Sequence, residues 1–246
     1  MRPSQRCTPR TFGPREDPAP VKGCIRSMEV NEERTVPALS PTPDTGVPIV
    51  PPGYPRQLER DVAAADGLRL RLRPIRPDDA GRLVEFHRRL SPHSVYLRFF
   101  TIHPTLSPAE VARFTTVDYV DRLALVATEG ERLIAVGRFD RFPDTTEAEV
   151  AFIVADEFQH HGIGALLLDE LVKAARERGI ETFSAQTLAD NRSMLDVYRH
   201  AGFPVTSSIE FGTVNVHFPI APSEASEAAF AARAARWHAP EGGGTP

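Results

Sequence analysis

The chain has 246 residues, of which 41% are hydrophobic, and a formal net charge of −4 at pH 7. This length and composition predict one substantial core, and the acidic balance argues against nucleic-acid binding. No apolar run approaches the ~20 residues that a membrane-spanning helix needs, and no apolar segment follows the N-terminal arginines as in a secretory signal. We therefore expect a cytoplasmic protein that binds neither nucleic acid nor a membrane.

The first 57 residues are rich in proline and show neither helical nor strand periodicity. Such a segment cannot bury enough apolar surface to offset the entropy lost on ordering, so we expect a disordered arm over 1–57. Met28 is an alternative start to Met1, because the local charge changes there from basic to acidic. Both cysteines, Cys7 and Cys24, lie in this arm and are too few for a disulfide framework or a zinc cluster.

Residues 58–220 carry the periodicities of one folded domain. Alternating residues predict strands, and apolar residues at helical spacing after acidic residues or a capping box predict helices. In chain order the expected elements are a strand at 68–73, helices at 77–90, 91–100 and from 107, a three-stranded meander at 123–128, 133–142 and 150–154, a helix at 162–178, a strand at 183–187, a helix at 191–200, and a hairpin of 205–211 and 214–218. Asp169, on the helix at 162–178, is expected to face solvent. Residues 221–246 are expected to form an Ala-rich, partly disordered tail that is helical near 223–237.

The turn between the strand at 150–154 and the helix at 162–178 reads Gln159-His-His-Gly162-Ile-Gly164. Backbone N–H groups at a helix N-terminus, with glycines that allow close approach, form a site for a phosphate or pyrophosphate. The turn therefore predicts that a nucleotide-containing cofactor is held here.

The order of the elements, together with Gln159-x-x-Gly162-x-Gly164 and the later Asn191…Tyr198…Gly202-Phe203, resembles the GNAT superfamily of acyl-CoA-dependent N-acetyltransferases over residues 67–218. The segments 72–79 and 96–100 are similar to the bacterial protein lysine acetyltransferases of the Pat type. The resemblance implies an α/β (α+β) fold, with a central mixed, mostly antiparallel sheet of six to seven strands and about four flanking helices. It also implies acetyl-CoA as co-substrate.

An amine with a pKa of ~10.4 is almost fully protonated at pH 7, so an N-acetyltransferase needs a group that removes a proton. In the resembled family the glutamate of Ala-Glu-Val-Ala-Phe is the general base, which implies this role for Glu149. Glu147 points the same way but lies further from the expected thioester. Tyr198 lies on the same helix face as Asn191, and its phenol can donate a proton to the departing CoA thiolate; the alternative is a core aromatic.

The resemblance places the pyrophosphate against the N–H groups of 159–165 and the pantetheine arm along 152–154. Asn191 is both a good N-cap and an implied cofactor contact. Adjacent histidines with no third ligand do not predict a metal site, so His160 and His161 are expected to donate to phosphates. The expected cofactor-binding residues are Phe152, Ile153, Val154, Gln159, His160, His161, Gly162, Ile163, Gly164, Ala165 and Asn191, with no metal.

The leading hypothesis is transfer of acetyl from acetyl-CoA to the ε-amine of a protein lysine, and the resemblance implies AMP-forming acyl-CoA synthetases as targets. Tyr96 and Arg98 are expected to shape the acceptor groove. A second hypothesis is an acetyltransferase for a small amine, such as a polyamine or an aminoglycoside-like compound. A deep acidic pocket would favour the small amine, and a shallow open groove the protein. A third hypothesis is a non-catalytic acyl-CoA-binding module, which predicts loss of the base or the acid.

Overall fold

The structure is a computed structural model that describes residues 50–64 and 66–238 of the chain. Most of the predicted arm, with Met28, Cys7 and Cys24, lies outside the described residues, as does the end of the tail. The last residues of the predicted arm belong to the fold, contrary to the expectation of disorder up to residue 57. Tyr54 is buried in the core, where its ring meets that of Tyr119 edge to face at 5.6 Å. Its hydroxyl donates to Glu59 at 2.8 Å.

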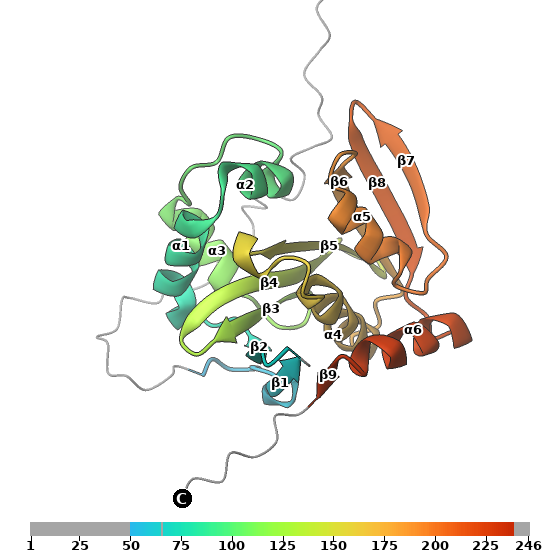
Figure 1. The fold of residues 1–246 in the computed structure, drawn as a ribbon, viewed down its shortest axis with the longest axis horizontal. Helices are drawn as coiled ribbons and strands as arrows, with labels where there is room; N and C mark the ends of the chain where they lie inside the picture. The colour runs from blue at the N-terminus through green and yellow to red at the C-terminus, as the bar shows by residue number, and fades with distance from the viewer. Residues whose placement is uncertain (1–49, 65, 239–246) are drawn as a thin grey trace, which may run out of the picture. The chain divides into compact units, whose positions relative to one another are not determined.

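One mixed sheet runs through the described residues, in the order β7-β8-β6-β5-β4-β3-β2-β1-β9 (Figure 1). β5 and β6 pair in parallel, and the other neighbours pair antiparallel, which confirms the predicted mixed, mostly antiparallel sheet. The described part has nine strands rather than six to seven, because β1 and β9 extend one edge. The strands are β1 Arg60–Ala64, β2 Arg69–Pro74, β3 Arg122–Glu129, β4 Arg132–Arg141, β5 Glu147–Val154, β6 Thr182–Leu188, β7 Thr206–Glu210, β8 Thr213–Pro219 and β9 Trp237–His238.

Six α-helices occur in the described residues rather than about four, with short 3-10 turns at Arg56–Leu58, Pro77–Asp79 and Asp156–Phe158. Proline at the first turn and a serine N-cap begin both the second and the third helix, as the sequence predicts. The helices are α1 Ala80–Arg89, α2 Pro92–Phe99, α3 Pro108–Thr115, α4 Ile163–Glu177, α5 Arg192–Arg199 and α6 Glu224–Ala234.

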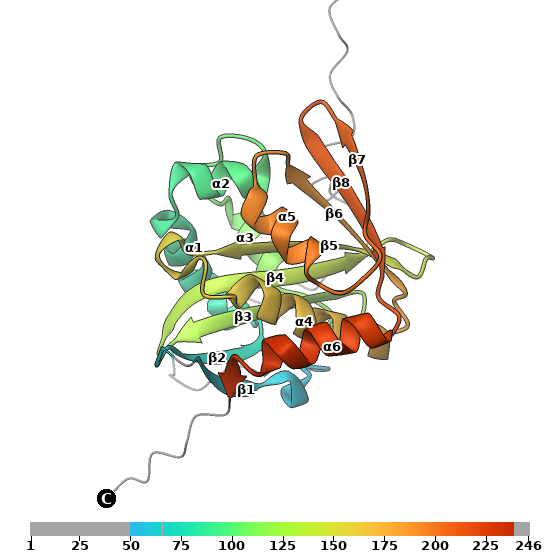
Figure 2. The same cartoon turned by 45° about the vertical axis from the view of Figure 1, so that its right-hand side comes forward.

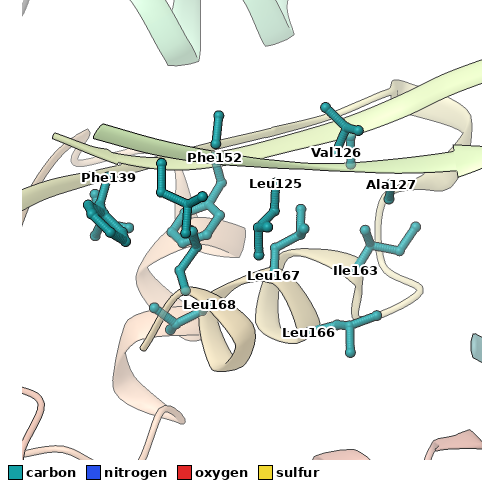
Figure 3. Close-up of a cluster of buried hydrophobic side chains, with 14 of the residues drawn as sticks. Leu125, Val126, Ala127, Phe139, Phe152, Ile163, Leu166, Leu167 and Leu168 are labelled. Carbon is teal, nitrogen blue, oxygen red and sulfur yellow. The ribbon is translucent and has the colours of Figure 1, made fainter. Parts of the chain in front are cut away.

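The sheet separates two layers of side chains. Leu125, Phe139 and Phe152 point to the face on which α4 packs, where they meet Leu167 and its neighbours (Figure 3). Gly137 lies on the same face, and a Cβ there would come within 2.9 Å of the Phe152 ring. Successive residues of a strand alternate between the two faces of the sheet. The strand neighbours of Leu125, Phe139 and Phe152 therefore point to the other face, toward the layer formed by α1, α2 and α3.

Helix α6 and strand β9 come from the stretch predicted as a tail and pack on the domain (Figure 2). The prediction that Asp169 faces solvent is wrong, because α6 covers that side of α4. Asp169 is 5% exposed and accepts three hydrogen bonds from the Arg233 guanidinium, at 2.7, 2.9 and 3.1 Å. Burial raises the pKa of Asp169, although its pairing with Arg233 opposes that shift. The partner of Asp169 lies 64 residues away, so the local pattern of α4 could not show it.

Candidate active site

Strands β5 and β6 are paired only at their first residues. The parallel register joins Glu147 to Thr182, Ala148 to Phe183 and Glu149 to Ser184. Beyond these pairs the strands diverge, as Figures 1 and 2 both show. The rest of β5 therefore turns one edge to an open wedge, and unpaired N–H and C=O groups of a strand edge can bind an extended ligand. This is the stretch 152–154 for which the sequence predicts the pantetheine arm.

The loop after β5 ends in an open helix N-terminus. Gly162 is the N-cap of α4 with a φ of 81°, and no side chain caps the helix. His160 also has a left-handed backbone, with a φ of 66°. Strain of this kind clusters at ligand sites, and uncapped first-turn N–H groups attract anions. The predicted phosphate site thus has the expected backbone form, while the side chain of Ile163 is buried in the core.

Two side chains predicted to face the cofactor have other contacts. Gln159 donates from Nε2 to Ser94 Oγ at 3.0 Å and to the Val154 carbonyl at 3.2 Å. His161 Nδ1 lies 3.1 Å from a carboxylate oxygen of Asp66, in the turn between β1 and β2. Both amide hydrogens of Gln159 are therefore engaged, whereas His161 uses only Nδ1 in its contact with Asp66. His160 is exposed.

A network that the sequence did not reveal ties α2 to this loop. The Asp156 carboxylate accepts from the Ser91 N–H at 2.9 Å and from the hydroxyls of Ser91 and Ser94 at 2.6 and 2.8 Å. Burial alone would raise the pKa of Asp156, but the hydrogen bonds from these serines outweigh it and lower the pKa. The start of α2 and the turn before α4 are therefore held as one unit. In the sequence, only the two serines at the start of α2 could have indicated this network, and serines there are equally well explained as helix caps.

Glu149 lies where β5 and β6 begin to separate. In register it stands between Asp140 of β4 and Ser184 of β6, on the side of the sheet that faces α1, α2 and α3. Glu147 is two residues further from the wedge, and its carboxylate lies 3.3 Å from His217 Nδ1. The structure thus places Glu149 rather than Glu147 at the mouth of the open edge.

Tyr198 and Arg98 reach the same place from α5 and α2. Tyr198 is 2% exposed and packs its ring against Phe218 with centroids 5.8 Å apart. Burial raises the pKa of the Tyr198 phenol; the charge of Arg98 lowers that pKa and the charge of Glu149 raises it. Burial and the nearby Arg138 lower the pKa of Arg98 to about 10, and Glu149 opposes that shift. The predicted base and the predicted acid are therefore close enough to interact electrostatically, and the partly buried Arg98 interacts with both.

A cavity lies between the sheet and the layer of α1, α2 and α3. Its walls are apolar apart from His87 and two arginines, and no aspartate or glutamate of the described residues lines it. Arg138, one of the two, is held by two hydrogen bonds of 2.7 Å to Asp140. The main lining side chains are Leu83, Phe86, Phe99, Phe114, Ala151 and Ile153, with Arg98 and Arg138.

Asn191 and Gly164 border the space between α4 and α5. The Asn191 side chain accepts from the Met194 N–H at 3.2 Å, which confirms it as the N-cap of α5. A Cβ at Gly164 would lie 3.8 Å from Val197 of α5, an ordinary van der Waals distance. The contact of Asn191 with a cofactor stays a prediction. Within the described ranges, no group of three or more His, Cys, Asp or Glu could hold a metal ion.

The sheet wedge and the open helix N-terminus can be compared with known proteins. A model of the Acetyltransferase (GNAT) family matches residues 92–203. The chain is 32% identical to the acetyltransferase PA5475 of Pseudomonas aeruginosa over 142 residues, which cover 56% of this chain and 76% of that protein. The crystal structure of the GNAT domain of S. lividans PAT is 43% identical, with a TM-score of 0.64, and the match covers 68% of this chain and 99% of that domain. The chain therefore belongs to the GNAT family of acetyltransferases.

A further relative bears on the predicted Pat resemblance. Acetyltransferase Pat of Mycolicibacterium smegmatis is 36% identical over 135 residues, which cover 53% of this chain. The chain spans only 40% of the length of that relative. Enzymes of this family use acetyl-CoA, in agreement with the predicted co-substrate. No helix among residues 50–64 and 66–238 is long and apolar enough to cross a membrane. The cytoplasmic location stays a prediction.

Proposed function

We propose that the protein transfers the acetyl group of acetyl-CoA to the ε-amine of a protein lysine, with Glu149 as general base and Tyr198 as general acid. The observation that carries this proposal is the position of Glu149 at the point where β5 and β6 separate, within electrostatic range of Tyr198. The open edge of β5 accepts the pantetheine arm, and the uncapped start of α4 accepts the pyrophosphate.

Each group then has one task in the transfer. Glu149 takes a proton from the lysine ammonium, directly or through one water, and the free amine attacks the thioester carbonyl carbon. A backbone N–H on the open edge of β5 donates to the carbonyl oxygen as it becomes negative. The C–S bond breaks, and Tyr198 gives its proton to the thiolate sulfur. The amide nitrogen loses its second proton, which returns to the phenol through solvent, and Glu149 releases the proton it took to solvent, so that both groups are restored.

The electrostatics of the site support this assignment of acid and base. The raised pKa of Tyr198 keeps the phenol protonated at neutral pH, as a proton donor must be. Arg98 is a partly buried cation close enough to Glu149 that the charge of Glu149 raises the pKa of the guanidinium. A non-catalytic acyl-CoA-binding module would need neither group, and both are in place.

The acceptor side favours a protein over a small polyamine. The cavity beside α1, α2 and α3 has two arginines and no carboxylate in its lining, so it is not the acidic pocket that a polyamine would favour. Large apolar side chains are instead exposed on α2 and the loop after it, at Tyr96 and Ile102, and at the tip of the β7–β8 hairpin, where Phe211 is 89% exposed. Such exposed groups are typical of surfaces that contact another protein. The Pat resemblance makes AMP-forming acyl-CoA synthetases the proposed targets.

Incubation with radiolabelled acetyl-CoA tests the proposal. The enzyme is offered purified acyl-CoA synthetases and, separately, a panel of polyamines and aminoglycosides, and label is followed on protein and on small molecules. We expect label on one or more lysines of a synthetase, identified by mass spectrometry, and none with Glu149→Gln at pH 7. Label on a small amine alone would favour the second hypothesis. Acetyl-CoA binding without transfer to any acceptor would favour the binding module.

A further inference from the structure

Strand β9 brings Trp237 to the loop that starts α4. Trp237 is the only tryptophan of the chain, and in the sheet it pairs with Ala64 of β1. It is 9% exposed. A Cβ placed on Gly162 would have one neighbouring atom within 4 Å, the indole Nε1 of Trp237 at 3.9 Å. The N–H edge of the indole therefore faces the N-cap residue of α4.

The indole N–H has no hydrogen-bond acceptor in the part of the chain that the structure describes. The indole nitrogen is not among the buried side-chain atoms that lack a partner, so it is accessible from solvent and can donate to a ligand. An indole nitrogen can only donate. The uncapped N–H groups at the start of α4 are donors as well. Two sets of hydrogen-bond donors thus lie near Gly162, an arrangement that favours an anionic ligand.

The position of Trp237 is fixed by the segment that carries it. Arg233 of α6 forms the paired hydrogen bonds to Asp169 of α4, and Phe230 meets Phe203 edge to face at 5.9 Å. A Cβ at Gly202 would come within 2.7 Å of the Ala225 carbonyl oxygen, so α6 is packed closely on the turn after α5. The carboxylate of Asp66, which could repel an anion near Gly162, is paired with His161.

We infer that Trp237 donates a hydrogen bond from its indole N–H to a phosphate oxygen of the CoA pyrophosphate, so that the C-terminal segment is part of the cofactor site. The inference rests on the proposed function in one respect, namely that acetyl-CoA binds with its pyrophosphate at the start of α4. Trp237 is then a binding residue that acts on the affinity for the nucleotide part of the donor and leaves the transfer chemistry unchanged.

Trp237→Phe tests this, since phenylalanine keeps an aromatic ring in place while it removes the N–H together with the five-membered ring of the indole. We expect the Kd for acetyl-CoA, measured by calorimetry, to rise about ten-fold, in keeping with loss of a hydrogen bond to a charged group. The Kd for S-acetylpantetheine, which lacks the pyrophosphate, should not change. In the wild-type protein, acetyl-CoA should alter the emission of the single tryptophan, and S-acetylpantetheine should alter it less. His238→Ala, at an exposed position of the same strand, is the matched control and should bind both donors as the wild type does.

The outcomes separate the inference from the function that it extends. Equal affinity of wild type and Trp237→Phe for acetyl-CoA would overturn the inference and leave the proposed function standing. A variant that loses affinity for both donors to the same degree would also overturn it, because that result assigns Trp237 to packing alone. A wild-type protein that binds neither donor would remove the proposed function as well.

Discussion

Glu149 of β5 and Ser184 of β6 form the last residue pair before the two strands separate. The backbone of Glu149 is fixed by the paired part of the sheet. Its carboxylate is next to the open edge of β5, where a thioester can lie. Glu147 has the same chemistry two residues earlier, yet it lies inside the paired region and contacts His217. Position relative to the wedge is therefore what distinguishes the two acids.

Replacing Glu149 by glutamine should separate binding from chemistry. The amide keeps the shape of the side chain but cannot accept a proton, so acetyl-CoA affinity should be retained while kcat at pH 7 falls about 10²–10⁴-fold. The deficit should shrink as the pH rises and free amine becomes abundant. Calorimetry and a pH series of initial rates measure the two effects, with Glu147→Gln as the control of equal chemistry. Wild-type turnover of Glu149→Gln at pH 7 would remove Glu149 from the mechanism.

Asp140, the neighbour of Glu149 on β4, should make stability depend on pH. Burial raises its pKa, but Arg138 and Arg122 outweigh this and lower the pKa to about 2. A carboxyl whose folded pKa lies below its unfolded value stabilises the fold above the unfolded pKa, and this stability is lost as the pH falls through the folded pKa. Asp140→Asn should therefore lower the free energy of unfolding by about 2 kcal/mol at pH 6.

The same substitution should have a much smaller effect near pH 2, where about half of Asp140 is protonated in the folded wild type and most of it in the unfolded chain. Urea unfolding of both proteins between pH 2 and pH 7 measures the difference. The control is Asp144→Asn, an exposed acid in the turn before β5. A difference between Asp140→Asn and the wild type that stays constant over this range would contradict the electrostatic origin of the effect.

How far the sequence predicted the structure depended on how local each signal was. The Gly162 turn and the Asn191 cap were predicted because each is defined by a few adjacent residues. Strand β9 has only two residues, and its pairing with β1 is a tertiary contact without a periodic pattern. The bonds from Ser91 and Ser94 to Asp156 join residues more than 60 positions apart. The fold of the site was therefore predictable from the sequence, and the contacts that hold it came from the structure.

Gly162→Asp tests the phosphate site by adding a negative charge, and it can be compared with the same substitution at a second glycine of similar backbone geometry. An aspartate here puts a negative charge where the pyrophosphate must approach, so the Kd for acetyl-CoA should rise at least ten-fold. Asp169→Ala is unsuitable for comparison, since Asp169 is buried and paired. Gly179→Asp is the better control, because Gly179 has a similar φ of 70° and lies beyond the other end of α4 with open space around it. Equal Kd values for the two variants would contradict the assignment of the loop.

The boundary of the N-terminal arm gives two deletions with opposite expectations. Deleting residues 1–49 should leave both the acetyl-CoA affinity and the melting temperature unchanged, because that stretch has no apolar periodicity and its prolines remove backbone donors. Deleting residues 1–57 also removes Tyr54, whose ring packs on Tyr119 and whose hydroxyl bonds to Glu59. Loss of a buried aromatic side chain costs about 3–5 kcal/mol, so this protein should unfold several degrees lower. Tyr54→Ala in the full chain should reproduce most of that loss. If the deletion of residues 1–49 already lowers the melting temperature, or reduces acetyl transfer to a protein acceptor, the arm contributes to the domain.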